Sequence, residues 1–161
     1  MGYAIAAAGE TLPSRFSALL DQISEPVPAL NVVIVSTDVA VCVAMTEILQ
    51  NCFVRVIVAN GLRELKSVCS KITPNVCLCG FELADGSFRD VVEYLEDQPE
   101  PTPVIMVSAP SVEDPPARFF DSVRVGALAT ICYPYRLKDV QLMVWTVIQC
   151  QREFGRVHQH V

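Results

Sequence analysis

The amino-acid sequence predicts an α/β domain in which five parallel strands form a doubly wound sheet, with an N-terminal helical extension. Between residues 31 and 154, short apolar runs rich in β-branched residues alternate with helical stretches five times. Parallel strands need a crossover between them, so this alternation is typical of a sheet with helices on both faces. The length of 161 residues suits one such domain. We therefore divide the chain into an N-terminal extension (1–30), the sheet domain (31–154) and a C-terminal tail (155–161).

The N-terminal extension contains one segment with helical periodicity, Ser14–Ile23. Apolar side chains recur there at the spacing that places them on one helix face: Phe16, Leu19, Leu20 and Ile23. The Pro-Val-Pro sequence at 26–28 separates this segment from the first strand. Because its apolar face needs a cover, we expect the segment to pack either on the sheet domain or on a second copy of the chain.

The predicted strands are short, mostly apolar runs of the kind that fits a sheet covered on both faces. In chain order they are Asn31–Ser36, Phe53–Val58, Asn75–Cys79, Pro103–Val107 and Leu128–Cys132. Ligands of such sheets bind at the carboxyl ends of the strands. The residues that follow each strand are therefore the first candidates for a functional site.

The predicted helices fill the intervals between and after these strands. They are Val39–Cys52, Leu62–Ile72, Phe88–Glu96, Pro115–Val125 and Leu137–Phe154. Asn60-Gly61 supplies the turn before the second helix, and Gly126 ends the fourth. Asp85-Gly86 predicts a further turn after the third strand.

Charge and hydropathy each argue against one class of partner. The net charge is −6 and no basic stripe is present, so we expect no direct nucleic-acid binding. Although 52% of the residues are hydrophobic, no apolar run approaches the roughly 18 residues of a spanning helix, so we expect no membrane insertion. The first residues lack the positive charge of a secretory signal, which agrees with a cytoplasmic protein.

The seven cysteines show no disulfide-framework spacing, which favours reduced thiols in a cytoplasmic setting. Cys77 and Cys79 are two residues apart on a predicted strand and so share a face. We interpret them as small core residues, with a metal or redox pair as the alternative. His158 and His160 lie in the terminal tail, so we expect no metal site and no cofactor.

Motifs at the predicted strand ends resemble those of a response-regulator receiver domain (CheY-like), a family with a flavodoxin-like fold. The resemblance covers roughly residues 31–154. It rests on LADGS at 83–87, PVIMVSA at 103–109 and GALATICYPY at 126–135, which occur in the family's order and spacing. The resemblance implies the same five-stranded parallel sheet and a phosphorylation pocket at its carboxyl edge.

The sequence departs from the family where the chemistry is done. The family places a phosphoryl-accepting aspartate at Gly80, two Mg²⁺-binding acidic residues at Ser36 and Thr37, and a lysine at Tyr133. Phosphoryl transfer needs a nucleophile, a divalent ion and a balancing cation, and all three are lost here. Ser108 matches the hydroxyl residue that meets the phosphoryl oxygen in the family.

We therefore predict a degenerate pocket without catalytic residues. Glu82 and Asp85 remain as nearby carboxylates and are alternative acceptors that we do not favour. Asp38 could fill one metal-ligand position, but a single carboxylate is a poor Mg²⁺ site. We expect Tyr133 to fill the space that the phosphoryl group would occupy. The predicted pocket consists of Ser36, Thr37, Asp38, Gly80, Glu82, Ser108 and Tyr133.

The predicted function is that of an atypical receiver domain in two-component, phosphorelay-type signal transduction. Without phosphorylation, we expect it to act as a protein–protein interaction or dimerisation module. The last helix is apolar on two sides, which predicts a homodimer through that helix and an unidentified signalling protein as a further partner. The predicted interface comprises Phe120, Leu128, Leu142, Trp145 and Gln149.

Two other classes of function remain open at this point. The pocket residues offer hydroxyl groups and space, so a small metabolite or nucleotide is the alternative occupant. An enzyme is not expected, because the sequence has no G-x-S-x-G elbow, no P-loop and no glycine-rich dinucleotide turn.

Overall fold

The computed structural model describes residues 30–109 and 116–158 of the chain. The predicted N-terminal helix at Ser14–Ile23 lies outside the described residues. None of the helices within the described ranges is both long enough and apolar enough to cross a lipid bilayer.

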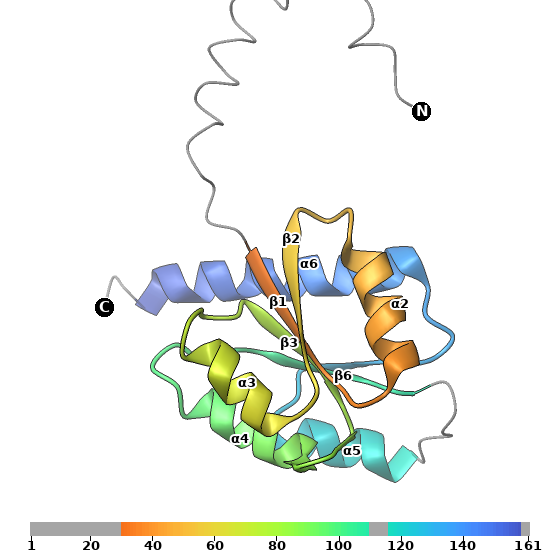
Figure 1. Ribbon diagram of the computed structural model, residues 1–161. Helices are drawn as coiled ribbons and strands as arrows, with labels where there is room; N and C mark the ends of the chain where they lie inside the picture. The colour runs from red at the N-terminus through yellow and green to blue at the C-terminus, as the bar shows by residue number, and fades with distance from the viewer. Residues whose placement is uncertain (1–29, 110–115, 159–161) are drawn as a thin grey trace, which may run out of the picture.

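Five parallel strands form the central sheet, in the order β2-β1-β3-β6-β7 (Figure 1). The predicted fold class is therefore confirmed. The sheet strands are β1 (Leu30–Val35), β2 (Val54–Ala59), β3 (Val76–Gly80), β6 (Val104–Val107) and β7 (Ala129–Ile131). The strands β2 and β7 form the two edges of this sheet, and β3 lies at its centre.

Within the described residues, five helices cover the two faces of the sheet. The helices α2 (Val39–Leu49) and α6 (Leu137–His158) share one apolar core with alternate residues of β1 and β3. The helices α3 (Leu62–Cys69) and α4 (Phe88–Glu96), with the end of α5 (Pro116–Val125), cover the other face. Figure 1 shows α6 on one side of the sheet and α3, α4 and α5 on the other.

The central strand β3 is buried along its whole length. Val76 and Leu78 belong to the core under α2 and α6, whereas Cys77 and Cys79 belong to the core under α3 and α4. Burial raises the pKa of the Cys79 thiol to about 12 and also raises the pKa of the Cys77 thiol. Both cysteines are thus core residues, as the sequence predicts.

A small hairpin follows β3 and was not predicted as strand. It pairs β4 (Glu82–Leu83) with β5 (Gly86–Ser87) in antiparallel register around the predicted Asp85-Gly86 turn. Ser87 then caps α4, because its side chain accepts from the backbone of Asp90 while the Asp90 carboxylate accepts from the backbone of Ser87.

Phe53 departs from the prediction that it begins the second strand. The helix α2 ends at Leu49 rather than at Cys52, and β2 begins at Val54. Phe53 lies in the turn between them with a φ of 56° in the left-handed region, and 93% of it is exposed. Its β-type side chain suggested a strand, but the turn needs one residue with a positive φ.

Candidate functional site

A cavity of about 130 Å³ opens at the carboxyl ends of β1 and β3. We call it the β1–β3 cleft. Five of the seven predicted pocket residues line it: Ser36, Thr37, Asp38, Gly80 and Glu82. Their convergence follows from topology, since the ends of neighbouring parallel strands meet at one edge of the sheet.

The floor of the cleft joins Ser36 and Gly80. Gly80 is the last residue of β3 and pairs with Val107 of β6. A Cβ atom at Gly80 would lie 3.2 Å from Ser36 Oγ, which is a tight contact. The Ser36 hydroxyl is buried and accepts a hydrogen bond from the Asp38 N–H at 3.1 Å. The floor is therefore uncharged, with a hydroxyl beside a residue that has no side chain.

The carboxylate of Asp38 belongs structurally to α2. Asp38 is the N-cap of this helix, and its Oδ1 accepts from the N–H groups of Ala40 at 2.9 Å and Val41 at 3.3 Å. These bonds satisfy two of the amides that a helix N-terminus leaves without partners. Asp38 directly follows the two positions where the family has its acidic pair, and its carboxylate here caps a helix.

The side of the cleft carries a cation that the sequence analysis missed. Arg118 of α5 lines the cleft, forms an ion pair with the Glu82 carboxylate and stacks over the Phe81 ring at 5.7 Å. Glu82 itself is mostly exposed, whereas the Arg118 side chain is about two-thirds covered. No motif marks this arginine, because its place depends on how α5 packs beside a strand 36 residues earlier.

Ser108 and Tyr133 lie apart from the cleft, at the end of β6 and after β7. We call this region the β6–β7 corner and include Tyr135 in it. The Tyr133 N–H donates to Ser108 Oγ at 3.0 Å, and the Tyr135 hydroxyl donates to the Ser108 carbonyl. The Tyr133 ring is exposed and packs edge-on against Tyr135, with centroids 5.5 Å apart. The expectation that Tyr133 fills the pocket is therefore wrong.

Asp85 also has a structural partner. Its carboxylate accepts from the N–H groups of Arg63 at 2.9 Å and Leu62 at 2.7 Å, at the start of α3. These backbone hydrogen bonds, first that of Arg63 and then that of Leu62, lower the pKa of the Asp85 carboxyl. A Cβ atom at Gly61 would collide with the same carboxylate, so a larger residue there would have to displace the Asp85 side chain.

The predicted interface residues divide between two parts of the surface. Phe120 is 67% exposed on α5, in edge-to-face contact with Phe119, and Leu128 is exposed just before β7. Leu142 is 68% exposed on α6, and Gln149 is also exposed. Trp145 is half-buried and packs against the core under α2 and α6. It lies on the flank of α6 that faces α2, since Gln141, one turn earlier, donates to the Ile48 carbonyl.

Among the described residues, the side chains that line the cleft offer hydroxyl groups, two carboxylates and one guanidinium. Within the described residues, no group of three or more histidine, cysteine, aspartate or glutamate side chains is placed to hold a metal ion. The strand end that could present a nucleophile carries Gly80, and the nearest cation is paired with Glu82.

Comparisons with known proteins identify the fold. No protein-family model matches the chain, and no curated protein matches it. Among solved structures, it resembles the CheY-like response regulator receiver domain protein from Methanospirillum hungatei JF-1, with a TM-score of 0.68 and 20% identity over 79% of this chain and 99% of that one. It also resembles the chemotaxis response regulator CheY4 of Vibrio cholerae, with a TM-score of 0.63 and 18% identity over 74% and 98% of the two chains.

A third similar structure is the signal receiver domain of an HD domain-containing protein from Pseudomonas fluorescens Pf-5. Its TM-score is 0.70 at 9% identity, over 80% of this chain and 93% of that one. At identities this low, the likeness concerns the fold, and the function has to be argued from the site. The chain therefore has the flavodoxin-like receiver fold.

Proposed function

We propose that this chain is an atypical receiver domain of two-component, phosphorelay-type signalling that acts without being phosphorylated, as a cytoplasmic interaction and dimerisation module. The observation that carries the proposal is Gly80 at the end of the central strand. A receiver fold presents its acceptor carboxylate at that position, and glycine has no oxygen to accept a phosphoryl group. We assign the domain no enzymatic activity.

The surroundings of Gly80 support the same proposal. Mg²⁺ binding requires hard anionic oxygens, but Ser36 and Thr37 are neutral and the Asp38 carboxylate caps α2. The Arg118 guanidinium supplies positive charge beside the cleft, and this charge repels a divalent metal ion. In the described part of the chain, the cleft thus has neither the acceptor carboxylate at the end of β3 nor a set of metal ligands.

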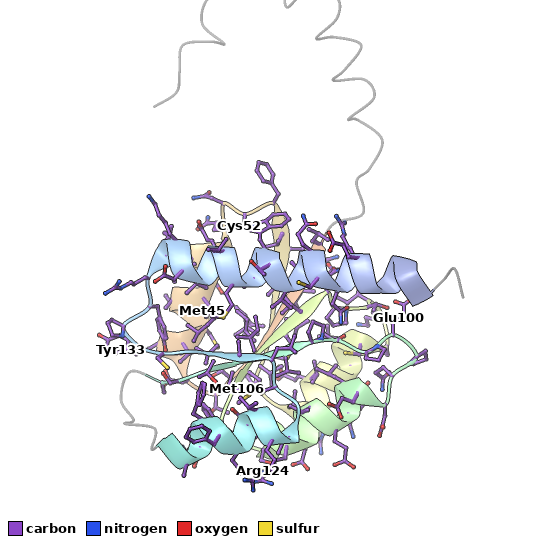
Figure 2. The ribbon with its side chains drawn as sticks, turned by 180° about the vertical axis from the view of Figure 1, so that it is seen from behind. Met45, Cys52, Glu100, Met106, Arg124 and Tyr133 are labelled. Carbon is purple, nitrogen blue, oxygen red and sulfur yellow. The ribbon has the colours of Figure 1, made fainter. Side chains whose placement is uncertain are left out.

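The surface around α5, β7 and α6 supports a role in binding another copy of the chain. Phe120, Leu128 and Leu142 are large apolar side chains exposed on these neighbouring elements, and β7 is an edge strand. Figure 2 shows this face, with α6 and α5 on either side of β7. Exposed apolar side chains of this size on adjacent elements favour a protein interface. We centre the dimer contact on Phe120 and Leu142, because Trp145 is partly used by the core.

Sedimentation equilibrium of the full chain tests the dimer. We expect Phe120→Glu and Leu142→Glu each to weaken self-association by about tenfold or more, since a charge replaces a buried apolar anchor. Val39→Glu is the matched control, because Val39 is an exposed apolar residue at the start of α2. A parent chain that stays monomeric at all concentrations, or a Val39→Glu change with the same effect, would contradict the proposal.

A small-molecule site in the β1–β3 cleft is the second candidate function. The observation that favours it is that Tyr133 does not fill the cavity, which leaves about 130 Å³ beside Arg118 and two hydroxyl residues. A thermal-shift screen of the full chain against nucleotides and inorganic phosphate tests this site. Binding should raise the melting temperature of the parent and not of Arg118→Gln, whereas no shift with any compound would exclude a site for these ligands.

A further inference from the structure

Phe53 combines two unfavourable features that nothing within the described domain repays. It is a non-glycine residue at positive φ, and its ring is 93% exposed. Asparagine or glycine would fit this turn with less strain, and a polar side chain would suit the exposure. A residue of this kind at a turn is a candidate contact point for another segment.

Phe53 adjoins an apolar surface on the β2 edge of the sheet. Val54 and Val56 are partly exposed on β2, and they pack against the same core cluster as Trp145 of α6. Cys52, the residue before Phe53, is buried in that cluster with the buried face of α6, and Figure 2 labels it beside this helix. We call this surface the β2–α6 patch and define it by Phe53, Val54, Val56 and Trp145.

The position of Trp145 places the patch where α2 ends. Gln141 of α6 donates at 2.9 Å to the carbonyl of Ile48, in the last turn of α2. Trp145 lies one turn further along α6 on the same flank, which brings it level with the turn that follows α2 and contains Phe53. The patch is thus formed by an edge strand, a turn and the flank of a helix.

We propose that the β2–α6 patch is the docking site for the apolar stripe of the chain's own segment Ser14–Ile23. Leu30 begins β1 and pairs directly with Val54, so the preceding chain enters the domain next to Phe53. Only residues 24–29 lie between the stripe and Leu30. Six extended residues reach roughly 20 Å, which is enough to bring the stripe onto the patch and too short to carry it far.

The short tether also decides between the chain's own segment and another molecule. A segment held so close has an effective concentration of about 1 mM or more, which a second copy has to exceed in order to compete. The stripe presents Phe16, Leu19, Leu20 and Ile23, and the patch presents one exposed phenylalanine and the half-buried Trp145. The patch and the proposed dimer contact use different residues: the patch lies at the β2 edge of the sheet, whereas the dimer contact is centred on Phe120 of α5 and Leu142 of α6.

Hydrogen exchange of the full chain tests the docking. In the parent, we expect the amides of residues 16–23 to exchange about tenfold or more slowly than in the Leu20→Glu variant. Phe53→Asn should remove the same protection, because asparagine keeps the positive φ but lacks the ring. Val39→Asn is the matched control, an exposed apolar residue replaced at the start of α2, and it should leave the protection unchanged.

The fluorescence of Trp145, the single tryptophan, supplies a second readout. Leu20→Glu should shift its emission to longer wavelength, since docking shields the ring from water, and the shift should not depend on protein concentration. Unprotected amides at 16–23 in the parent would overturn the proposal, as would equal protection in Phe53→Asn. Protection that disappears on dilution of the parent would also overturn it, because the segment would then be docked on a second copy.

Discussion

The β1–β3 cleft and the β6–β7 corner both lie at the carboxyl ends of the strands, but their polar groups have different partners. In the corner, the Ser108 hydroxyl and carbonyl both accept hydrogen bonds from the tyrosine segment that follows β7. In the cleft, hydroxyls, carboxylates and Arg118 surround about 130 Å³ of open space. Sequence motifs equate Ser108 with a ligand-contacting residue, yet its surroundings show a hydroxyl used to join a strand to a turn.

This difference gives a rule for interpreting strand-end residues. A polar side chain whose hydrogen bonds are completed within the domain contributes to stability, whereas one that faces open space is available to a ligand or partner. The two regions can therefore be compared by mutation. Changes in the corner should lower stability, and changes in the cleft should do so only where a side chain caps a helix or forms an ion pair.

The largest effect is expected in the corner, from Ser108→Ala. Removing the hydroxyl leaves the Tyr133 N–H without its acceptor at a partly buried position, which should lower the free energy of unfolding by about 1–3 kcal/mol. Urea denaturation followed by circular dichroism measures the change. Thr37→Ala in the cleft is the control and should cost less than about 0.5 kcal/mol, since its hydroxyl is exposed and 3.5 Å from the Glu82 carbonyl. Equal losses in the two variants would remove the distinction.

Asp38→Ala should have the next largest effect, although Asp38 lines the cleft. Losing the N-cap of α2 should cost about 1 kcal/mol in the same denaturation experiment. Asp38→Asn separates capping from charge, because the amide oxygen can still accept from Ala40 and Val41. We expect its stability to lie within a few tenths of a kcal/mol of the parent. A large loss in Asp38→Asn would show that the negative charge itself matters there.

A smaller effect is expected for the ion pair at the side of the cleft. A double-mutant cycle of Arg118→Gln and Glu82→Gln should give a coupling of at most about 1 kcal/mol, because Glu82 is mostly exposed to water. Arg124→Gln is the control, an exposed arginine on the same helix, and it should show no coupling to Glu82. Coupling of equal size with Arg124 would mean that the cycle reports general electrostatics rather than this contact.

Asp85 should give the smallest effect, present above about pH 4 and disappearing in acid, where the carboxyl of the parent is protonated. Its folded pKa is lowered by the backbone hydrogen bonds from α3, so it contributes stability above its unfolded pKa of about 3.9 and loses that contribution as the pH falls through the folded value. Asp85→Asn should therefore flatten the stability profile below about pH 4. Thermal melts between pH 2 and pH 7 measure this; an unchanged acid slope would assign the loss to other carboxyl groups.

The sheet could be predicted because parallel strands buried on both faces give continuous apolar runs with helical intervals. The same logic placed Gly80, Ser36 and Glu82 at one edge, since the ends of adjacent strands must converge there. The direction of a side chain after a strand is not encoded in this pattern. Ser108 and Tyr133 pair with each other through a backbone N–H, which depends on the turn after β7.

Arg118 and Phe53 show two further limits of sequence-based prediction. Arg118 reaches the cleft only because α5 packs beside the end of β3, and helix packing is decided by contacts distant in the chain. Phenylalanine is common in strands, but Phe53 lies in a turn with a left-handed backbone conformation, where tertiary context overrides its propensity. The predicted fold was therefore correct where periodicity decides, and the site was incomplete where packing does.

The measurement that tests the central claim most directly is the intact mass of the full chain after incubation with acetyl phosphate and Mg²⁺, with a receiver domain that can be phosphorylated as a positive control. We predict that the mass of this chain does not change while the control gains a phosphoryl group, because no carboxylate stands at the end of β3. A phosphoryl adduct mapped to Asp38, Glu82 or Asp85 would contradict the account.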